Sequence, residues 1–331
     1  SLLLHAVSKY SNCEAMLSPY VITIVEKCLK AMREIENPSA YVRLLRYLFR
    51  ALAQGQFGRF GQGPRNNTIS GASAHTVPYG LMSPAQMFAM RVTRFMHEHG
   101  VRQEALRAIS LASYHHAQTN PAATMYGRPL TAEKYDDSRW ITEPFHLYDC
   151  CQENDGAAAI ILVPAERAAD FGHPPCYVLG AVSGSHHRAA AGVHNDAHYA
   201  TSTFETVAPR LYEMAKVAPS DVDVVQSYEN FTGGVMMALV EHGFCAPEEA
   251  NDFFTLDNLI TPDGAFPLNT SGGNLAEAYM HGLGLTIEAV RQVRGTSPNQ
   301  VRAGGVDVSM MIAGPMVTPV SSCIFGSEAS L

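Results

Sequence analysis

Apolar residues recur at helical spacing near the start of the chain. Positions three and four apart predict two helices between about residues 20 and 53, interrupted at Asn37-Pro38-Ser39. Residues 54–82 are rich in glycine, asparagine and serine and have no periodic apolar face, so they are expected to form a long loop. Long loops inside compact enzymes are usually functional.

Two more helices are expected after this loop. Ser83 can cap the first, Pro84 suits its first position, and Gly100 ends it. A second helix is predicted over about 102–116.

The rest of the chain alternates between strand and helix patterns. The short, continuously apolar run 157–163 predicts a strand that is buried on both faces, and 165–171 is expected to be helical. The segments that follow are strands near 176–182, 222–227 and 306–313 and helices near 203–216, 233–243 and 274–294. This alternation indicates an α/β architecture.

Composition narrows the class of protein. With 331 residues, 47% of them hydrophobic, the chain can bury a large core in one or two domains. Its formal net charge of −8 argues against a general nucleic-acid binder, which needs a basic face. No apolar run reaches the roughly 18 residues of a membrane span.

The seven cysteines are scattered and never spaced as CxxC. We therefore expect neither a disulfide framework nor a structural zinc site. Reduced cysteines of this kind are typical of a cytoplasmic location, which we expect for this chain. His194 and His198 are four residues apart but lack the carboxylates of a zinc hydrolase motif, so no catalytic metal is expected.

The strand predicted at 222–227 runs into Tyr228-Glu229-Asn230. In an open α/β sheet, ligands bind at the carboxyl ends of strands, where a tyrosine and an amide can do acid–base work and orient a carbonyl. The alternative is a capped turn, because Asn230 is a common N-cap residue type.

A second candidate is Asn269-Thr270-Ser271-Gly272-Gly273, which precedes a predicted helix. Paired glycines let the backbone approach a ligand, and free N–H groups at a helix start can bind a thioester oxygen. Tyr279 and His281 would lie within two turns of that start, although Tyr279 also fits an apolar helical stripe and hence the core. Gly314, after the strand at 306–313, is either a ligand wall or an ordinary turn.

Several stretches of the chain resemble the thiolase superfamily, in particular the branch of lipid-transfer thiolases and steroid side-chain aldolases. They are RFGQ (59–62), PYGLMSPAQMFAMRVTRFMHEHG (78–100), SRWITEPFHLYDCCQENDGAAAIIL (138–162), SYENFTG (227–233), EHGFC (241–245) and NTSGGNLAEAYMHGLGLTIEAVRQVRG (269–295). The resemblance implies a thiolase fold with αβαβα layers. Residues 1–170 would form a partial N-terminal half, with a coenzyme A-binding loop region at about 54–144, and residues 171–331 the C-terminal half. The N-terminal half is expected to be truncated, with an insertion at about 17–47.

The expected mechanism follows from the positions at which this chain differs from the thiolases. Tyr228 stands where thiolases carry Asn or His, Tyr279 replaces the histidine of their Gly-His-Pro motif, and Met311 stands near the second catalytic cysteine. The nucleophilic cysteine would precede Ser1. Tyrosines at these two places resemble the aldolase branch, which implies retro-aldol cleavage of a β-hydroxyacyl-CoA with a steroid or other bulky lipid side chain. One phenol would take the proton of the β-hydroxyl group and the other would protonate the enolate.

A tyrosine that acts as a base needs help, because its ordinary pKa is about 10. His281 and Asn230 are candidates for that tuning, whereas Glu229 would oppose ionisation. Contacts to the coenzyme A thioester are expected from Asn269, Ser271, Gly272, Gly273, Gly314 and Arg59. No tightly bound cofactor is expected.

Two other functions stay open. The chain could be a thiolase or acetyl-CoA acyltransferase whose nucleophilic cysteine is missing from this chain, or a non-catalytic subunit that binds acyl-CoA or lipid. The resemblance also implies a homodimer and a small partner that combines an OB fold with a zinc ribbon.

Overall fold

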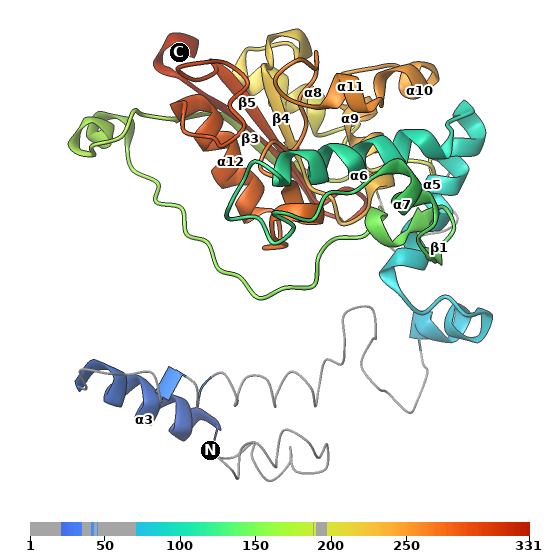
Figure 1. Ribbon diagram of the computed structural model, residues 1–331, viewed down its shortest axis with the longest axis horizontal. Helices are drawn as coiled ribbons and strands as arrows, with labels where there is room; N and C mark the ends of the chain where they lie inside the picture. The colour runs from blue at the N-terminus through green and yellow to red at the C-terminus, as the bar shows by residue number, and fades with distance from the viewer. Residues whose placement is uncertain (1–20, 35–40, 43–44, 46–70, 188, 190–196) are drawn as a thin grey trace. The chain divides into compact units, whose positions relative to one another are not determined.

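A computed structural model describes residues 21–34, 41–42, 45, 71–187, 189 and 197–331 of the chain (Figure 1). The chain divides into two compact units, Ser1–Pro84 and Ala85–Leu331. In the first unit, helix α3 (Val21–Glu34) confirms the first of the two helices expected there. Of the second expected helix, only residues 41–42 and 45 are described, and they are helical. Arg59 and most of the expected loop fall outside the described residues.

The second unit contains a four-stranded mixed sheet. Its strands are β3 (Tyr177–Gly184), β4 (Val224–Ser227), β5 (Val308–Ala313) and β6 (Val320–Gly326), in the order β3-β6-β5-β4. β6 is antiparallel to both of its neighbours, and β4 is parallel to β5. The three strands expected near 176–182, 222–227 and 306–313 are therefore confirmed, whereas β6 was not predicted.

Helices cover this sheet and the hairpin β1 (Trp140–Thr142)–β2 (Phe145–His146) lies outside it (Figure 1). α8 packs on β3, and α12 packs on β4 and β5. The longer helices are α5 (Pro84–His99), α6 (Gln103–Ala117), α8 (Ala208–Ala215), α9 (Thr232–Glu241) and α12 (Leu283–Arg294), and the short ones are α7 (Ala132–Asp136), α10 (Ala250–Phe253) and α11 (Leu256–Leu259). The helices expected at 84–99, 102–116 and 233–243 are confirmed, and the one expected at 203–216 begins later, at Ala208.

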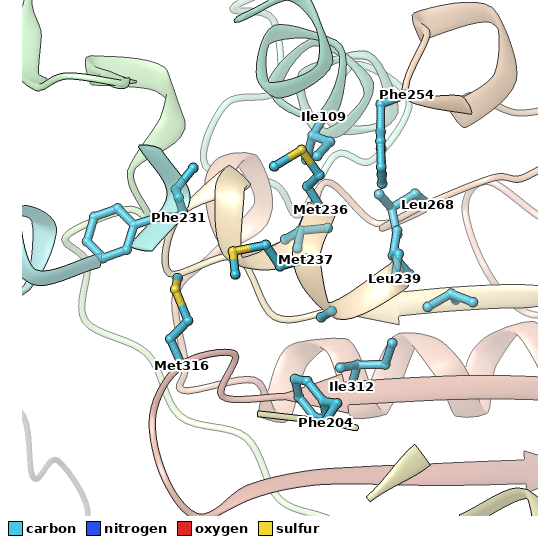
Figure 2. Close-up of a cluster of buried hydrophobic side chains, with 14 of the residues drawn as sticks. Ile109, Phe204, Phe231, Met236, Met237, Leu239, Phe254, Leu268, Ile312 and Met316 are labelled. Carbon is cyan, nitrogen blue, oxygen red and sulfur yellow. The ribbon is translucent and has the colours of Figure 1, made fainter. Parts of the chain in front are cut away.

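The main core forms around α9, which packs against both α6 and β4. α9 is apolar on all sides, and Met236, Met237 and Leu239 are fully buried. Figure 2 shows them beside Ile109 of α6 and Ile312 of β5. Each such side chain contributes about 1.5–3 kcal/mol on burial, so α9 and the loop before it are held rigidly in place.

The strand predicted at 157–163 is wrong. These residues are extended but pair with no described strand, and Ile161 and Leu162 are 82% and 77% exposed. An apolar run satisfies only one condition for a buried strand, because the backbone also needs a hydrogen-bonding neighbour. The segment 165–171, expected to be helical, contains a 3₁₀ helix at Ala165–Asp170.

The continuous helix expected over 274–294 is also wrong. A π-helical turn at Gly273–Glu277 ends in an extended residue, Ala278, and α12 begins only at Leu283. Left-handed backbone at His281 (φ 51°) and Gly282 (φ 83°) separates the two. Tyr279 therefore lies in an irregular break and not on a helical stripe.

None of the described helices is long and apolar enough to cross a membrane. The expected division near residue 170 into two thiolase halves stays a prediction.

Candidate active site

The structure brings Tyr228 and Tyr279 together. Tyr228 directly follows β4, and its backbone N–H donates to the carbonyl of Ile312 on β5 at 2.9 Å. Tyr279 comes from the break before α12, and the two phenol oxygens are 2.5 Å apart. Their rings meet edge to face at 5.9 Å. Two hydroxyl groups from separate segments thus form one hydrogen-bonded pair at the carboxyl end of β4.

The break before α12 supplies the space for this pair. A Cβ atom on Gly282 would lie 2.8 Å from Cδ2 of Tyr228 and 3.0 Å from the Met311 methyl carbon. Asn154 accepts a hydrogen bond from the Tyr279 N–H at 2.7 Å. The position of Tyr279 therefore depends on a glycine and on a distant loop, and not on helical periodicity.

Burial makes both phenols hard to ionise. It raises the pKa of Tyr228, and the hydrogen bond with Tyr279 and the nearby Cys151 and Glu229 raise it further. Burial also raises the pKa of Tyr279, but there the hydrogen bond from Tyr228 acts in the opposite direction and lowers it. For both phenols, burial is the largest cause of the raised pKa.

The two side chains expected to tune the pair differ in their placement. Nδ1 of His281 lies 3.5 Å from the Tyr279 hydroxyl oxygen, and the His281 side chain is exposed. Asn230 instead accepts from the N–H of Phe231 at 2.9 Å and donates to the carbonyl of Pro315 at 3.5 Å. His281 can therefore act on Tyr279 directly, whereas the hydrogen bonds of Asn230 organise the loop before α9.

Cys151 is a site residue that the sequence patterns did not reveal. Its N–H donates to the carbonyl of Asn230 at 3.2 Å, so the chain at 150–151 lies beside the loop after β4. The thiol is buried, and burial together with Glu229 raises its pKa to about 12. A thiol in this state is a poor nucleophile at neutral pH. Only its position in the folded structure identifies Cys151 as a site residue, because the adjacent cysteines Cys150-Cys151 match no spacing that predicts a site.

Glu229 is fully buried directly behind the pair. Its Oε2 accepts from the N–H of Asn274 at 2.9 Å, and its Oε1 accepts from the hydroxyl of Ser113 on α6 at 3.3 Å. Burial raises the pKa of this carboxyl to about 7, against the opposing effect of these hydrogen bonds. A Cβ atom on Gly273 would overlap the carboxylate, and Gly273 has a left-handed φ of 58°.

The remaining candidates are engaged inside the protein. The Asn269 amide makes both hydrogen bonds to the backbone of Ser227, at 2.7 and 2.9 Å, and so continues the edge of β4. The Ser271 hydroxyl donates to Glu277 at 2.5 Å. Gly314 accepts a turn hydrogen bond from Val317 at 2.9 Å. Coenzyme A contacts at these residues and at Gly272 and Gly273 stay predictions.

Within the described residues, no three His, Cys, Asp or Glu side chains cluster as ligands for a metal ion. A hollow of about 340 Å³ lies apart from the phenol pair. Its lining is mainly polar, and its Arg94 is already paired with Glu98 at 2.5 Å.

Comparisons with known proteins show which family the chain resembles. A family model described as thiolase C-terminal domain-like matches residues 183–327, and a second, described as Tra1 HEAT repeat central region, matches residues 1–62. The chain is 40% identical over 295 residues to a steroid side-chain-cleaving aldolase of Thermomonospora curvata, covering 85% of this chain and 72% of the relative. It is 37% identical to a 17-hydroxy-3-oxo-4-pregnene-20-carboxyl-CoA lyase of Mycobacterium tuberculosis, covering 84% of this chain and 73% of the relative.

A solved structure, an Ltp2-ChsH2(DUF35) aldolase, superimposes with a TM-score of 0.75 at 39% sequence identity. The match covers 85% of this chain and 76% of that one. The α/β arrangement of the sheet and its helices is thus thiolase-like, as the sequence resemblance implied.

Proposed function

This chain belongs to the thiolase superfamily, in the branch that includes steroid side-chain aldolases, and from that premise we propose that it cleaves a β-hydroxyacyl-CoA by a retro-aldol reaction. The observation that carries the proposal is the pair of partly buried phenol oxygens 2.5 Å apart at the end of β4. Two groups within hydrogen-bonding reach can share a proton, so one can serve as acid while the other serves as base.

The bond changes follow from the chemistry of the thioester. A phenolate takes the proton of the β-hydroxyl group, the hydroxyl carbon becomes a carbonyl, and the bond between the α and β carbons breaks. Its electron pair passes to the α carbon as a thioester enolate, and the neutral phenol protonates that carbon. The products are a ketone or aldehyde and a shortened acyl-CoA, and no acyl-enzyme forms.

The mutual hydrogen bond lets the two tyrosines divide the work. Because either hydroxyl can donate to the other at 2.5 Å, one phenol accepts the proton of the substrate and the other supplies a proton to the enolate. The ring of His281, whose Nδ1 lies 3.5 Å from the Tyr279 hydroxyl oxygen, can donate a hydrogen bond to a phenolate at Tyr279. The N–H groups of Gly272 and Gly273 already donate to the Asn269 carbonyl at 2.9 Å and to the Ser271 hydroxyl at 3.4 Å, so thioester binding by this turn would require those hydrogen bonds to be exchanged.

Two single substitutions test the proposal. Tyr228→Phe and Tyr279→Phe remove one hydroxyl each, and each should lower kcat for aldol cleavage by about 10²–10⁴-fold, the usual contribution of a general acid or base. Tyr212→Phe is the matched control, since Tyr212 is a partly buried tyrosine whose hydroxyl donates to the carbonyl of His242, outside the site. Cleavage is followed without free coenzyme A, and thermal unfolding checks the fold. Full activity in both site variants would refute the mechanism.

The same assays separate the alternatives. A thiolase or acyltransferase would react only with free coenzyme A, and a carrier subunit would bind acyl-CoA without turnover by either route. Acyl-CoA binding measured by calorimetry would identify the second alternative.

We extend the proposal to substrate and partners. The names of the two curated relatives support a steroid side chain or another bulky lipid on the acyl group. The aldolase structure, whose name includes a DUF35 chain, supports a partner of that kind, which the sequence resemblance describes as an OB fold with a zinc ribbon. A homodimer and a cytoplasmic location complete the proposal, and sedimentation of the chain alone and mixed with such a partner tests the assembly.

A further inference from the structure

Glu229 joins the two segments that carry the tyrosines. It is the residue after Tyr228, and its carboxylate accepts the N–H of Asn274 in the π-helical turn that leads to Tyr279. Ser113 of α6 donates to the same carboxylate. The carboxylate is therefore a direct link between the end of β4, α6 and the turn.

The loop at 151–154 reinforces the same link. The N–H of Cys151 donates to Asn230, the N–H of Gln152 donates to the carbonyl of Asn274 at 3.0 Å, and Asn154 accepts the N–H of Tyr279. The Asn274 backbone is thus held on both sides, by Gln152 at its carbonyl and by Glu229 at its N–H. Loss of the Glu229 contact would leave a buried N–H group unpaired, which destabilises this arrangement of the turn.

We infer that Glu229 is a positioning residue for the tyrosine pair, one that fixes the Tyr279 segment relative to Tyr228 and whose negative charge opposes phenolate formation. This inference rests on the proposed retro-aldol function only for its effect on turnover. The contacts themselves, and the electrostatic effect on the phenols, are independent of the reaction.

The surroundings of Glu229 determine when it is charged. The titratable groups that face it are Cys151, whose pKa it helps to raise, and Tyr228, whose pKa it also raises. Ser113 and Asn274 contribute hydrogen bonds but no charge, and Asn269 stabilises the ionised form. Since burial brings the pKa of Glu229 to about 7, its charge changes in the neutral range. Below that pH the charge that opposes phenolate formation is lost.

Magnetic resonance of tyrosines labelled with ¹³C at Cζ tests this without any substrate. Signals of Tyr228 and Tyr279 are assigned by their absence in Tyr228→Phe and Tyr279→Phe. In the wild-type chain the Tyr228 signal should show a titration step near pH 7, the value at which Glu229 changes charge. Glu229→Gln should abolish the step, because glutamine can accept from Asn274 and donate to Ser113 but carries no charge.

Two controls locate the source of the step. Glu241→Gln alters another buried carboxylate, which accepts from the N–H groups of Ser202 and Phe204, and should leave the step in place. His281→Gln removes the ionisable ring beside Tyr279 and should also leave the Tyr228 step. A step that persists in Glu229→Gln, or that is absent from the wild type, overturns the electrostatic part of the inference.

Turnover tests the positioning part. Glu229→Ala should lower kcat at least about 10-fold with a smaller change in KM, since it disturbs the phenol pair rather than ground-state binding. Glu229→Gln should restore kcat and shift the rising limb of the pH–rate profile to lower pH, because it removes the charge that opposes ionisation. An unshifted profile, or failure of glutamine to restore kcat, overturns the inference. If Glu229→Ala does not fold, the inference is still tested by the pH–rate profile of Glu229→Gln and by the magnetic resonance titration.

Discussion

At the scale of single residues, burial shifts the pKa of several ionisable side chains in the unit Ala85–Leu331 in the direction that favours the neutral form. Burial raises the pKa of Asp149 to about 6 even though Tyr135 and Thr232 donate to it. Burial also lowers the pKa of His116 to about 3 and that of His242 to about 4. Charging any of these groups inside the protein costs free energy, so pH is a sensitive variable for its stability.

His242 gives a direct test of this cost. Its ring bridges the carbonyl of Ala238 and the hydroxyl of Ser322, at 2.6 and 3.0 Å, with no counter-charge in those contacts. As pH falls from about 6.5 to about 4, the unfolded chain binds a proton that the folded chain does not. Stability is therefore lost in that window, by about 1.4 kcal/mol per pH unit.

His242→Gln should remove this contribution. The free energy of unfolding of the wild type, measured by urea denaturation at a series of pH values, should fall relative to that of the variant as pH is lowered through the window. The exposed His97→Gln is the control, because its ring meets solvent in both states. A constant difference between wild type and His242→Gln would show that the histidine is not held neutral by burial.

At the scale of elements, the segment 157–162 is exposed, and its contribution to the free energy of unfolding can be measured directly. Ile161→Ser combined with Leu162→Ser should change the free energy of unfolding by no more than about 0.5 kcal/mol, as is usual for surface positions. The double variant should also associate less with itself in sedimentation, because adjacent exposed apolar residues on an extended chain favour aggregation.

Ile312→Ser is the matched control for burial, since Ile312 is fully buried on β5. It should destabilise the protein by about 2–5 kcal/mol, the range for truncating a buried isoleucine. If the double variant at 161 and 162 loses as much, those side chains are buried in solution.

How far the elements could be predicted depends on where their determinants lie. Pro84 and Gly100 lie in or next to α5, so its limits could be predicted locally. The break before α12 could not, because Tyr279 is held there by Asn154 from another part of the chain. β6 escaped prediction since its alternation is hidden by serines such as Ser321 and Ser322, which lie within the sheet.

At the scale of the whole molecule, the buried hydrophobic clusters all belong to one unit. Every described member of the three clusters lies within residues 85–331. A chain that starts at residue 85 should therefore unfold cooperatively, with a Tm within a few degrees of the full chain. It should nevertheless lose aldol turnover, because it lacks the first part of the predicted coenzyme A-binding region at 54–144.

Calorimetry and the cleavage assay measure the two outcomes separately. Non-cooperative unfolding of the shortened chain would contradict the first, and full turnover would contradict the second. The full chain measured in parallel provides the reference for both.

The fold class and the two tyrosines could be predicted because the chain contains sequence motifs that resemble those of the family, and the tyrosines lie within these motifs. Periodicity alone suggested only an α/β architecture, and it placed Tyr279 equally well in a core. The effect of the Glu229 charge was expected from its place next to Tyr228. Its contacts to Ser113 and Asn274, and the position of Cys151, could not be predicted, because they depend on which distant segments meet. The number of chains in the assembly and the division near residue 170 depend on surfaces that no local pattern encodes.

The overlap between a side chain at position 273 and the Glu229 carboxylate has a consequence for sequence divergence. A relative that keeps the glutamate can accept alanine at 273 only if the carboxylate moves away, and the left-handed φ of 58° at this position also favours glycine. Substitutions at the two positions should therefore be correlated across homologues, although the residues are far apart in the chain.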